Sequence, residues 1–346
     1  MNIAYILSSL ANAAPIRVME LLSRLMTLHG HTCIVFYLDE KTDTLPFSCQ
    51  TQRFSTKQTL DFTAYDIVHS SGLRPDRYVA RTREFGGRTK YLSTIHNFFI
   101  EDFTSQYNWL VAQYCGRRWM QSLNKFDAVV TLSRVGVDYY TKWIKKASLK
   151  CVYNARVIDG SGELNEAELR QLNKFKGDSK LIGINALLSP VKGIDQVIRS
   201  LVFMPDYKLF IVGDGKSRES LELLALRLNI LDRCFFAGFR RDAHRYLTHY
   251  DVYVMSSYSE GFPLALLEAA QYKIPTVCSS IPIFQEIFHP DEVSFFELNN
   301  IPSLSDAIRR ATNNKELGER MYARYIKDYT PENMYTHYQN IYNEKV

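Results

Sequence analysis

The sequence predicts an α/β protein made of two Rossmann-like, doubly wound domains. Strand-like and helix-like segments alternate along most of the chain, which is typical of parallel sheets whose strands are joined by crossover helices. The 346 residues exceed what one ordinary core holds and suit two domains of about 150 residues each. The alternation also falls into two series, separated by a stretch that contains Gly160, Ser161 and Gly162.

The first series starts almost at the amino terminus, where Ile3-Ala4-Tyr5-Ile6-Leu7 has the apolar composition of a buried strand. Apolar side chains recur at helical spacing over residues 16–28, which predicts the first crossover helix. Further strand-like runs rich in β-branched and aromatic residues follow at 32–37, 67–69, 91–95, 128–132 and 150–153. Together they predict a first domain over residues 1–155.

The second series predicts a domain over residues 156–326, with the join near 154–173. Its strands are expected at 180–185, 208–212, 234–237, 252–255 and 276–278, and its helices at 194–201, 218–228 and 243–248. The chain then ends in a segment whose apolar residues have helical spacing, namely Met334, Tyr335, Tyr338, Ile341 and Tyr342. This spacing predicts a last helix within residues 327–346.

Composition indicates a soluble globular enzyme, with 46% hydrophobic and 23% charged residues. No apolar run approaches the length of a membrane span, and the start of the chain is expected to be a strand rather than a signal peptide. A cytoplasmic location is therefore expected. The six cysteines are scattered without a C-x-x-C pair, so neither a zinc site nor a disulfide framework is predicted.

Positive charge is concentrated in the first domain. Residues 1–155 carry a net charge of +7, and the remainder carries −2. The clusters Arg117-Arg118-Trp119 and Lys142-Trp143-Ile144-Lys145-Lys146 mix cations with aromatics, which fits a protein lying peripherally on anionic lipid headgroups. Ordinary solvated helix faces with Trp buried beneath them explain the same pattern. No nucleic-acid recognition motif accompanies it, so nucleic acid is not expected as a partner.

The most informative segment for function runs from Glu260 to Glu268. A strand at 252–255 leads into a polar break, and Pro263 suits the first position of the helix that follows. The backbone N–H groups near Phe262 to Ala265 then lack intrahelical partners and attract an anion such as a diphosphate. Donor-binding residues are therefore expected at this helix start, namely Gly261, Phe262, Pro263 and Leu264. Glu268 is placed to accept from ribose hydroxyls and Glu260 from sugar hydroxyls. The segment therefore predicts a nucleotide-sugar site.

The same segment resembles the E-x7-E signature of retaining GT4-like glycosyltransferases, which have the GT-B fold. This resemblance implies two Rossmann-like domains facing across a cleft and a last helix that crosses back to the first domain. It also implies transfer of a hexose-type sugar from a nucleotide sugar, UDP-linked by preference, to a glycan or lipid-linked acceptor. The implied setting is bacterial surface polysaccharide synthesis, such as lipopolysaccharide, O-antigen or capsule.

A second element of the donor site is Leu187-Leu188-Ser189-Pro190-Val191-Lys192-Gly193, which resembles the family's G-R-L-x-x-x-K-G loop. Lys192 is expected to stabilise the negative charge that collects on the departing phosphate. Leu187 stands where the family has an arginine, and we hypothesise that Arg240 or Arg241 supplies the missing charge. Gly213, in Val212-Gly213-Asp214-Gly215, is expected near the donor, mainly in the structural role of a tight turn.

The first domain is expected to supply the acceptor side. Thr94-Ile95-His96-Asn97 resembles the family's T-x-H motif, which implies that His96 borders the transferred sugar and that Asn97 lies beside it. His69, at the end of the preceding strand, is expected to contact substrate or to support the site from behind. Ala14 lies in a loop where relatives often carry two adjacent glycines, so it is also assigned to the acceptor side.

No cofactor or metal is expected, because Lys192 and a helix end take the place of a metal ion at the diphosphate. The chain contains no Asp-x-Asp pair of the kind that binds a metal–diphosphate in the other large glycosyltransferase fold. Two alternatives remain at this level. One is a non-catalytic GT-B protein that binds a sugar nucleotide or acts as a scaffold, and the other is a GT-B sugar-nucleotide epimerase.

Overall fold

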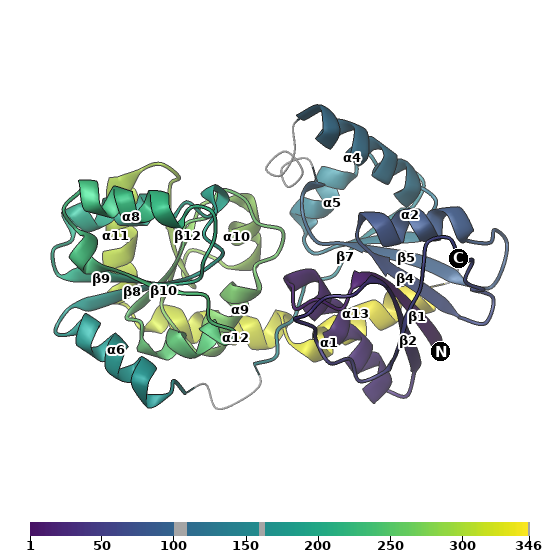
Figure 1. Cartoon of the computed structure of the whole chain (residues 1–346), viewed down its shortest axis with the longest axis horizontal. Helices are drawn as coiled ribbons and strands as arrows, with labels where there is room; N and C mark the ends of the chain where they lie inside the picture. The colour runs from purple at the N-terminus through teal and green to yellow at the C-terminus, as the bar shows by residue number, and fades with distance from the viewer. Residues whose placement is uncertain (100–108, 159–162, 345–346) are drawn as a thin grey trace. The chain divides into compact units, whose positions relative to one another are not determined.

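The computed structural model describes residues 1–99, 109–158 and 163–344. The chain divides into two compact units (Figure 1). The first unit comprises Met1–Arg156 together with Tyr329–Val346, and the second unit comprises Val157–Asp328. Each unit has a parallel sheet with helices packed on it, so the prediction of two Rossmann-like α/β domains is confirmed.

The first unit contains a seven-stranded sheet in the order β3-β2-β1-β4-β5-β6-β7. The strands are β1 (Asn2–Ser9), β2 (Thr32–Asp39), β3 (Gln50–Arg53), β4 (Ile67–Ser71), β5 (Lys90–Ile95), β6 (Ala128–Thr131) and β7 (Ser148–Cys151). Ile3 pairs with Cys33 on one side and with Ile67 on the other, both in parallel register. Successive strands are added outward from β1 and then from β4, so the order reverses between these two strands.

Helices of the first unit pack on this sheet. They are α1 (Ala14–Leu28), α2 (Leu73–Thr82), α4 (Trp109–Leu123), α5 (Arg134–Tyr140) and α13 (Pro331–Asn343). The apolar spacing over 16–28 correctly predicted α1, which buries Ile16, Met19 and Leu22. Sequence reasoning missed β3, because all four of its residues are polar and exposed at the sheet edge. It also missed α2, where Pro75 and a buried Asp76 interrupt the apolar pattern.

The last helix, α13, belongs to the first unit, as the predicted return of the chain requires. Its Tyr342 hydroxyl lies 2.7 Å from Nδ1 of His69 in β4, and its Tyr338 hydroxyl lies 3.0 Å from the Thr94 hydroxyl in β5. The Lys90 ammonium donates to the carbonyl oxygens of Ile341 and Glu344 and so caps the end of the helix. Buried polar contacts thus attach the carboxyl-terminal helix to the first sheet.

The second unit contains a six-stranded sheet in the order β10-β9-β8-β11-β12-β13. The strands are β8 (Lys180–Asn185), β9 (Tyr207–Val212), β10 (Cys234–Gly238), β11 (Val252–Met255), β12 (Thr276–Ser279) and β13 (Ser294–Phe296). The order reverses between β8 and β11. Five of these strands were predicted, and the short β13 was not.

The α-helices of the second unit are α6 (Glu166–Lys176), α7 (Ile194–Ser200), α8 (Arg218–Arg227), α9 (Leu264–Gln271), α10 (Pro282–Ile287), α11 (Ile301–Thr312) and α12 (Glu316–Asp328). Shorter 3-10 segments are η1 (Pro190–Lys192), η2 (Leu201–Phe203), η3 (Leu231–Arg233) and η4 (Ala243–His249). The segment expected as a helix at 243–248 is therefore a 3-10 helix. In the described part of the chain, no helix combines the length and apolar character that crossing a bilayer requires.

We predict that Tyr342→Phe destabilises the protein by about 1–3 kcal/mol, because it leaves a ring nitrogen of the fully buried His69 without its partner. Urea unfolding followed by circular dichroism measures this loss. Tyr335→Phe is the matched control. Tyr335 lies in α13 like Tyr342, but its ring stacks on His29 at the end of α1 and takes no part in the His69 network. Equal unfolding midpoints for the two variants and the unmodified protein would contradict the prediction.

Candidate active site

The second sheet changes winding direction between β8 and β11, and the loops after these two strands leave its carboxyl edge side by side. In open α/β sheets, ligands bind at such a reversal of strand order, because the diverging loops leave a crevice there. Lys192 follows β8, and Glu260 follows β11. The topology therefore brings together two side chains that are 68 residues apart in the sequence.

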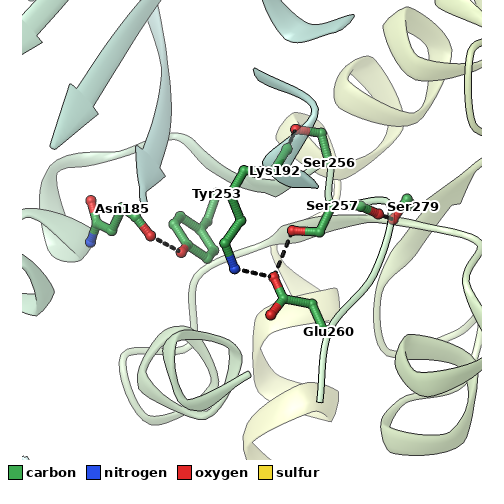
Figure 2. Close-up of polar contacts among 7 residues, drawn as sticks. All are labelled: Asn185, Lys192, Tyr253, Ser256, Ser257, Glu260 and Ser279. Carbon is green, nitrogen blue, oxygen red and sulfur yellow. Dashed lines mark hydrogen bonds and ion pairs between the residues drawn. The ribbon is translucent and has the colours of Figure 1, made fainter. Parts of the chain in front are cut away.

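Lys192 and Glu260 form an ion pair in which Nζ lies 2.6 Å from Oε1 (Figure 2). The Ser257 hydroxyl donates to the same oxygen at 2.6 Å. The side chains of Lys192 and Glu260 are 24% and 11% exposed, so the pair is shielded but still reachable from solvent. Both donors approach Oε1, which leaves Oε2 available to a hydroxyl of an incoming ligand.

Backbone contacts fix the position of Lys192. The Tyr258 N–H donates to the carbonyl of Val191, and the Ser256 hydroxyl donates to the carbonyl of Lys192, each at 2.8 Å. Gly193 has a φ of 59° in the left-handed region, and a Cβ there would lie 2.3 Å from the Ser256 carbonyl oxygen. Only glycine allows this approach, which explains why a Lys-Gly pair ends the turn.

Buried side chains support the pair from behind. The Tyr253 hydroxyl donates to the carbonyl of Asn185 at 3.3 Å, and the Ser279 hydroxyl donates to the carbonyl of Ser257 at 2.6 Å (Figure 2). Burial raises the pKa of Tyr253, and the negative charges of Glu268 and Glu260 raise it further. Tyr253 therefore stays protonated at physiological pH and keeps its hydroxyl proton for the bond to Asn185.

Helix α9 begins beside this pair. The sequence predicted Pro263 as the first residue of this helix. In the structure Pro263 is the N-cap and Leu264 is the first helical residue, so the predicted start was wrong by one residue. No side chain caps this end, and the first turn contains no acidic residue. Phe262 is buried and anchors the helix start, whereas Leu264 and Glu268 are half-buried. The end of α9 therefore offers positive backbone dipoles without a competing carboxylate in its first turn.

Gly213 and Gly215 have the structural role that the sequence suggested, in the turn after β9. A Cβ at Gly213 would lie 1.8 Å from the carbonyl oxygen of Ala186, and one at Gly215 would lie 2.4 Å from that of Leu188. The N–H of Leu188 donates to the carbonyl of Asp214 at 2.9 Å. The two glycines thus allow the turn after β9 to pack against the loop that leads to Lys192.

Leu187 projects from that loop with 66% of its surface exposed, at the position where the motif that the loop resembles has an arginine. Arg240, one of the two residues proposed to compensate, lies 3.5 Å from the Glu168 carboxylate. It also hydrogen-bonds the Tyr246 hydroxyl. Compensation by Arg240 would require these contacts to open.

In the first unit, His96 follows β5 at the carboxyl edge of the sheet. Its Nε2 lies 3.0 Å from the hydroxyl of Ser71 at the end of β4. The ring is half-buried, and burial lowers the pKa of His96 to about 4. The imidazole is therefore neutral at physiological pH. Sequence reasoning missed Ser71, whose position became evident only from the pairing of β4 with β5.

His69 does not reach the acceptor side as a direct contact, which corrects that part of the prediction. Its side chain is fully buried, and its two ring nitrogens contact the hydroxyls of Tyr342 and Thr94 at 2.7 and 2.8 Å. Burial lowers the pKa of His69 to about 3, with a smaller effect from His96. His69 therefore supports β4, β5 and α13 from within the core.

The two other acceptor-side residues lie on the surface of the first unit. Ala14 is exposed at the start of α1, after the carboxyl end of β1. Asn97 is exposed next to His96, and its carbonyl accepts from the Tyr140 hydroxyl of α5. The ends of β1 and β5 thus present Ala14, His96 and Asn97 along one edge of the first sheet.

A second buried polar cluster was not anticipated from the sequence. The Asp76 carboxylate accepts from the hydroxyls of Ser70 and Ser93 and from Nε1 of Trp119, at 2.6, 2.9 and 2.7 Å. Burial raises the pKa of Asp76 to about 7. Trp119 is therefore a core residue, as the alternative explanation for the Arg117-Arg118-Trp119 cluster required, and does not itself lie on a membrane-facing surface.

Across residues 1–99, 109–158 and 163–344, no three His, Cys, Asp or Glu side chains gather as ligands for a metal ion. The positive groups found around the Glu260 carboxylate are the Lys192 ammonium and the end of α9.

Comparison with known proteins identifies matches in both halves of the chain. Residues 165–328 match the family model described as glycosyl transferases group 1, and residues 17–156 match glycosyltransferase family 4. The O-antigen biosynthesis glycosyltransferase WclY of Escherichia coli is 31% identical over 99% of this chain and 98% of its own length.

Two further proteins are similar over much of the chain. The E. coli UDP-Gal:α-D-GlcNAc-diphosphoundecaprenol α-1,3-galactosyltransferase is 26% identical over 73% of this chain and 68% of its own length. The solved structure of HepE from Anabaena in complex with UDP superposes with a TM-score of 0.83. It covers 99% of both chains at 16% identity, so it supports the fold alone.

We predict that His69 makes stability depend on pH. Its folded pKa of about 3 lies below the unfolded value of about 6.5, so the stability it contributes is present above pH 6.5 and is lost as the pH falls toward 3. The stability advantage of the unmodified protein over His69→Gln should shrink by about 1 kcal/mol between pH 7.5 and 5.5, as measured by urea unfolding at each pH.

His337→Gln replaces an exposed histidine of α13 and serves as the control, because it leaves both contacts of His69 intact. The test compares the free energies of unfolding of the variants at each pH, because Asp76 changes the stability of all of them in the opposite direction. Its raised pKa favours folding as the pH falls through 7. A difference between the unmodified protein and His69→Gln that stays constant with pH would refute the prediction.

Proposed function

Because the chain belongs to the glycosyl transferases group 1 family, we propose that it transfers a hexose from a UDP-sugar to a hydroxyl of a lipid-linked glycan, with retention of anomeric configuration. The observation that carries this proposal is the meeting of Lys192 and Glu260 beside the uncapped amino end of α9. That arrangement combines a positioned cation, fixed dipoles and a hydroxyl acceptor, which are the groups that a sugar diphosphate requires.

Lys192 stabilises the leaving group. When the bond between the anomeric carbon and the phosphate oxygen breaks, the departing diphosphate gains negative charge. The 2.6 Å contact with Glu260 already orients the Lys192 ammonium, so little rearrangement is needed for it to stabilise the charge on the diphosphate. An ion placed before the reaction stabilises the transition state more than the ground state, which is the condition for acceleration.

Glu260 orients the sugar. Its Oε1 is held by Lys192 and Ser257, so Oε2 accepts from a sugar hydroxyl. A carboxylate fixed by two donors gives a stronger directional preference than a free surface glutamate, because less side-chain entropy is lost on binding. Glu268 lies on the half-buried face of α9 and accepts from the ribose hydroxyls.

His96 borders the transferred sugar from the first unit. A neutral imidazole suits this position, because a positive charge would repel the oxocarbenium-like centre that develops at the anomeric carbon. The contact between Nε2 and Ser71 orients the ring and leaves Nδ1 for substrate. Ser71 is thus a positioning residue.

We further propose that no metal ion takes part. The departing phosphate oxygen removes the acceptor proton on the face that it leaves, while the acceptor oxygen bonds to the anomeric carbon on that same face. This sequence retains configuration and needs positive charge only at the diphosphate. Lys192 and the end of α9 supply that charge.

The names of the relatives support the choice of substrates. WclY is named as an O-antigen biosynthesis enzyme, and the galactosyltransferase is named for a UDP-sugar donor and a diphosphoundecaprenol-linked acceptor. HepE has also been solved with UDP-glucose. These names favour a UDP-hexose donor, a lipid-linked acceptor and a place in O-antigen or lipopolysaccharide assembly.

The exposed Leu187 favours one competing function, a GT-B protein that binds a sugar nucleotide without turning it over. Loss of one cation from the expected pair would weaken leaving-group stabilisation. Transfer or donor hydrolysis by the purified protein excludes this alternative, and conversion of the nucleotide sugar without an acceptor would indicate an epimerase instead.

We predict that Lys192→Ala and Glu260→Gln each lower turnover by about 10²- to 10³-fold, because each removes a contact that strengthens as the leaving group departs. Turnover is measured by release of UDP from a saturating donor in the presence of a lipid-linked acceptor extract. Lys315→Ala, which changes an exposed lysine of the same unit, should retain full activity. Activity within twofold of the unmodified protein in both site variants would reject the assigned roles.

We also predict that UDP-sugars raise the melting temperature in the presence of EDTA as much as in its absence. At 100 times its dissociation constant a donor contributes about 2.7 kcal/mol of apparent stability, which thermal-shift measurements resolve. A panel of UDP- and GDP-linked sugars identifies the preferred base and hexose. A shift that requires Mg²⁺ or Mn²⁺ would contradict the metal-independent proposal, and no shift with any donor would contradict the donor site itself.

A further inference from the structure

Helix α4 of the first unit exposes an unusual set of large apolar side chains. Trp109, Leu110 and Tyr114 are 60%, 71% and 65% exposed, and Val111 is exposed beside them. All four lie in the first two turns of a 15-residue helix. Scattered exposed apolar residues are normal on a protein surface, but a contiguous group on one helix marks an interaction site.

The opposite face of α4 packs against the core of the first unit. Ala112, Trp119 and Leu123 are buried, and Trp119 also donates to Asp76. Gly116 lies so close to the ring of Phe99 that a Cβ there would approach it to 1.9 Å. Rotating α4 to hide its exposed apolar residues would break these contacts, so the exposed face is a fixed property of the fold.

Cations continue the same exposed face toward the end of the helix. At 100° per residue, Arg117 and Arg118 project on the side that carries Leu110 and Tyr114, and Arg118 lies 5.9 Å from the ring centroid of Tyr114. No acidic residue occurs between Trp109 and Phe126.

A second cationic segment adjoins the carboxyl end of α4. The Asn124 side chain bonds the backbone of Trp143, Lys145 and Lys146, at 3.0, 2.7 and 3.0 Å. Residues 139–150 contain four lysines and no acidic residue. The first two turns of α4 are thus apolar on their exposed side, and the end of the helix and the adjoining segment are cationic without acidic residues. This arrangement is complementary to an anionic lipid surface, where acyl chains lie beneath phosphate headgroups.

We propose that α4 docks the first unit onto an anionic lipid bilayer. Trp109, Leu110 and Tyr114 enter the boundary between headgroups and acyl chains, and Arg117 and Arg118 contact lipid phosphates. The proposal rests on the proposed function only in that a lipid-linked acceptor gives membrane docking its purpose. It does not depend on the identity of the donor or on the roles of Lys192 and Glu260.

The first test is co-sedimentation of the full chain with vesicles. Binding should be strong with phosphatidylglycerol mixed into phosphatidylcholine, weak with phosphatidylcholine alone, and reduced by salt. Near an anionic surface each cation contributes about fivefold in affinity, so Arg117→Gln/Arg118→Gln should weaken binding roughly 25-fold. Leu110→Ser/Tyr114→Ser should weaken it by at least about tenfold through lost apolar burial.

The matched control is Leu223→Ser/Leu226→Ser, which changes two exposed leucines on α8 of the second unit. This variant should bind vesicles as the unmodified protein does. All substituted side chains are exposed, and circular dichroism verifies that each variant is folded. Failure of the unmodified protein to bind anionic vesicles, or equal losses in the α8 control, would overturn the proposal.

A second test locates the contact. The chain has three tryptophans, of which Trp119 is buried and Trp143 is half-buried, so Trp109 is the most exposed of them. Vesicles with brominated acyl chains should quench the fluorescence of the unmodified protein, and Trp109→Phe should abolish most of that quenching. Quenching that persists in Trp109→Phe would place the membrane contact elsewhere and overturn the assignment to α4.

Failure of this proposal can be distinguished from failure of the proposed function. Transfer to a water-soluble acceptor analogue should be the same in the α4 variants and in the unmodified protein, whereas transfer to acceptor embedded in vesicles should fall with vesicle binding. Lost activity on both acceptors would assign α4 to the catalytic machinery. If vesicles do not bind but α4 variants change the oligomeric state by light scattering, the face contacts another protein chain instead.

Discussion

The close approach of the Lys192 turn to the loop after β11 is the constraint on which the site depends. Gly193 permits it, because any side chain there would meet the carbonyl of Ser256. The bond from Ser256 to the carbonyl of Lys192 then fixes the turn, and the ammonium is left within 2.6 Å of Glu260. The strand order brings the loops of Lys192 and Glu260 to the same edge of the sheet, and Gly193 allows these loops to approach closely. Without either, the cation and the carboxylate, which lie on separate loops, would be too far apart to form an ion pair.

The resulting ion pair is stable for a reason that also suits ligand exchange. A fully buried pair would lose more in desolvation than it gains in attraction, whereas a fully exposed pair would have little orientation. Lys192 and Glu260 are partly exposed, so water still solvates them while Ser257 restricts the carboxylate. In the proposed function, a diphosphate would therefore share the ammonium without the cost of breaking a dry salt bridge.

Most of the fold could be predicted from the sequence, because parallel strands in an α/β protein are buried on both faces and appear as short apolar runs. Two of the missed elements follow the same physics: β3 is polar because it lies at an edge, and α2 carries Pro75 and Asp76 within its first turn. Site residues on recognisable turns, such as Lys192, were also predictable. Ser71 and Ser257 were not, because a serine carries no signal until tertiary structure supplies its partner.

Leu187 changes how the donor site must balance charge. With one cation, Lys192, and two carboxylates, Glu260 and Glu268, the side chains alone carry a net negative charge toward an anionic diphosphate. The amino end of α9 must supply the rest, and its first turn has neither an acidic residue nor a side-chain cap that would consume its N–H groups. A carboxylate introduced there would remove the remaining attraction. With no second cation beside Lys192 in the described part of the chain, the unmodified start of α9 is therefore a strict requirement of the proposed donor site.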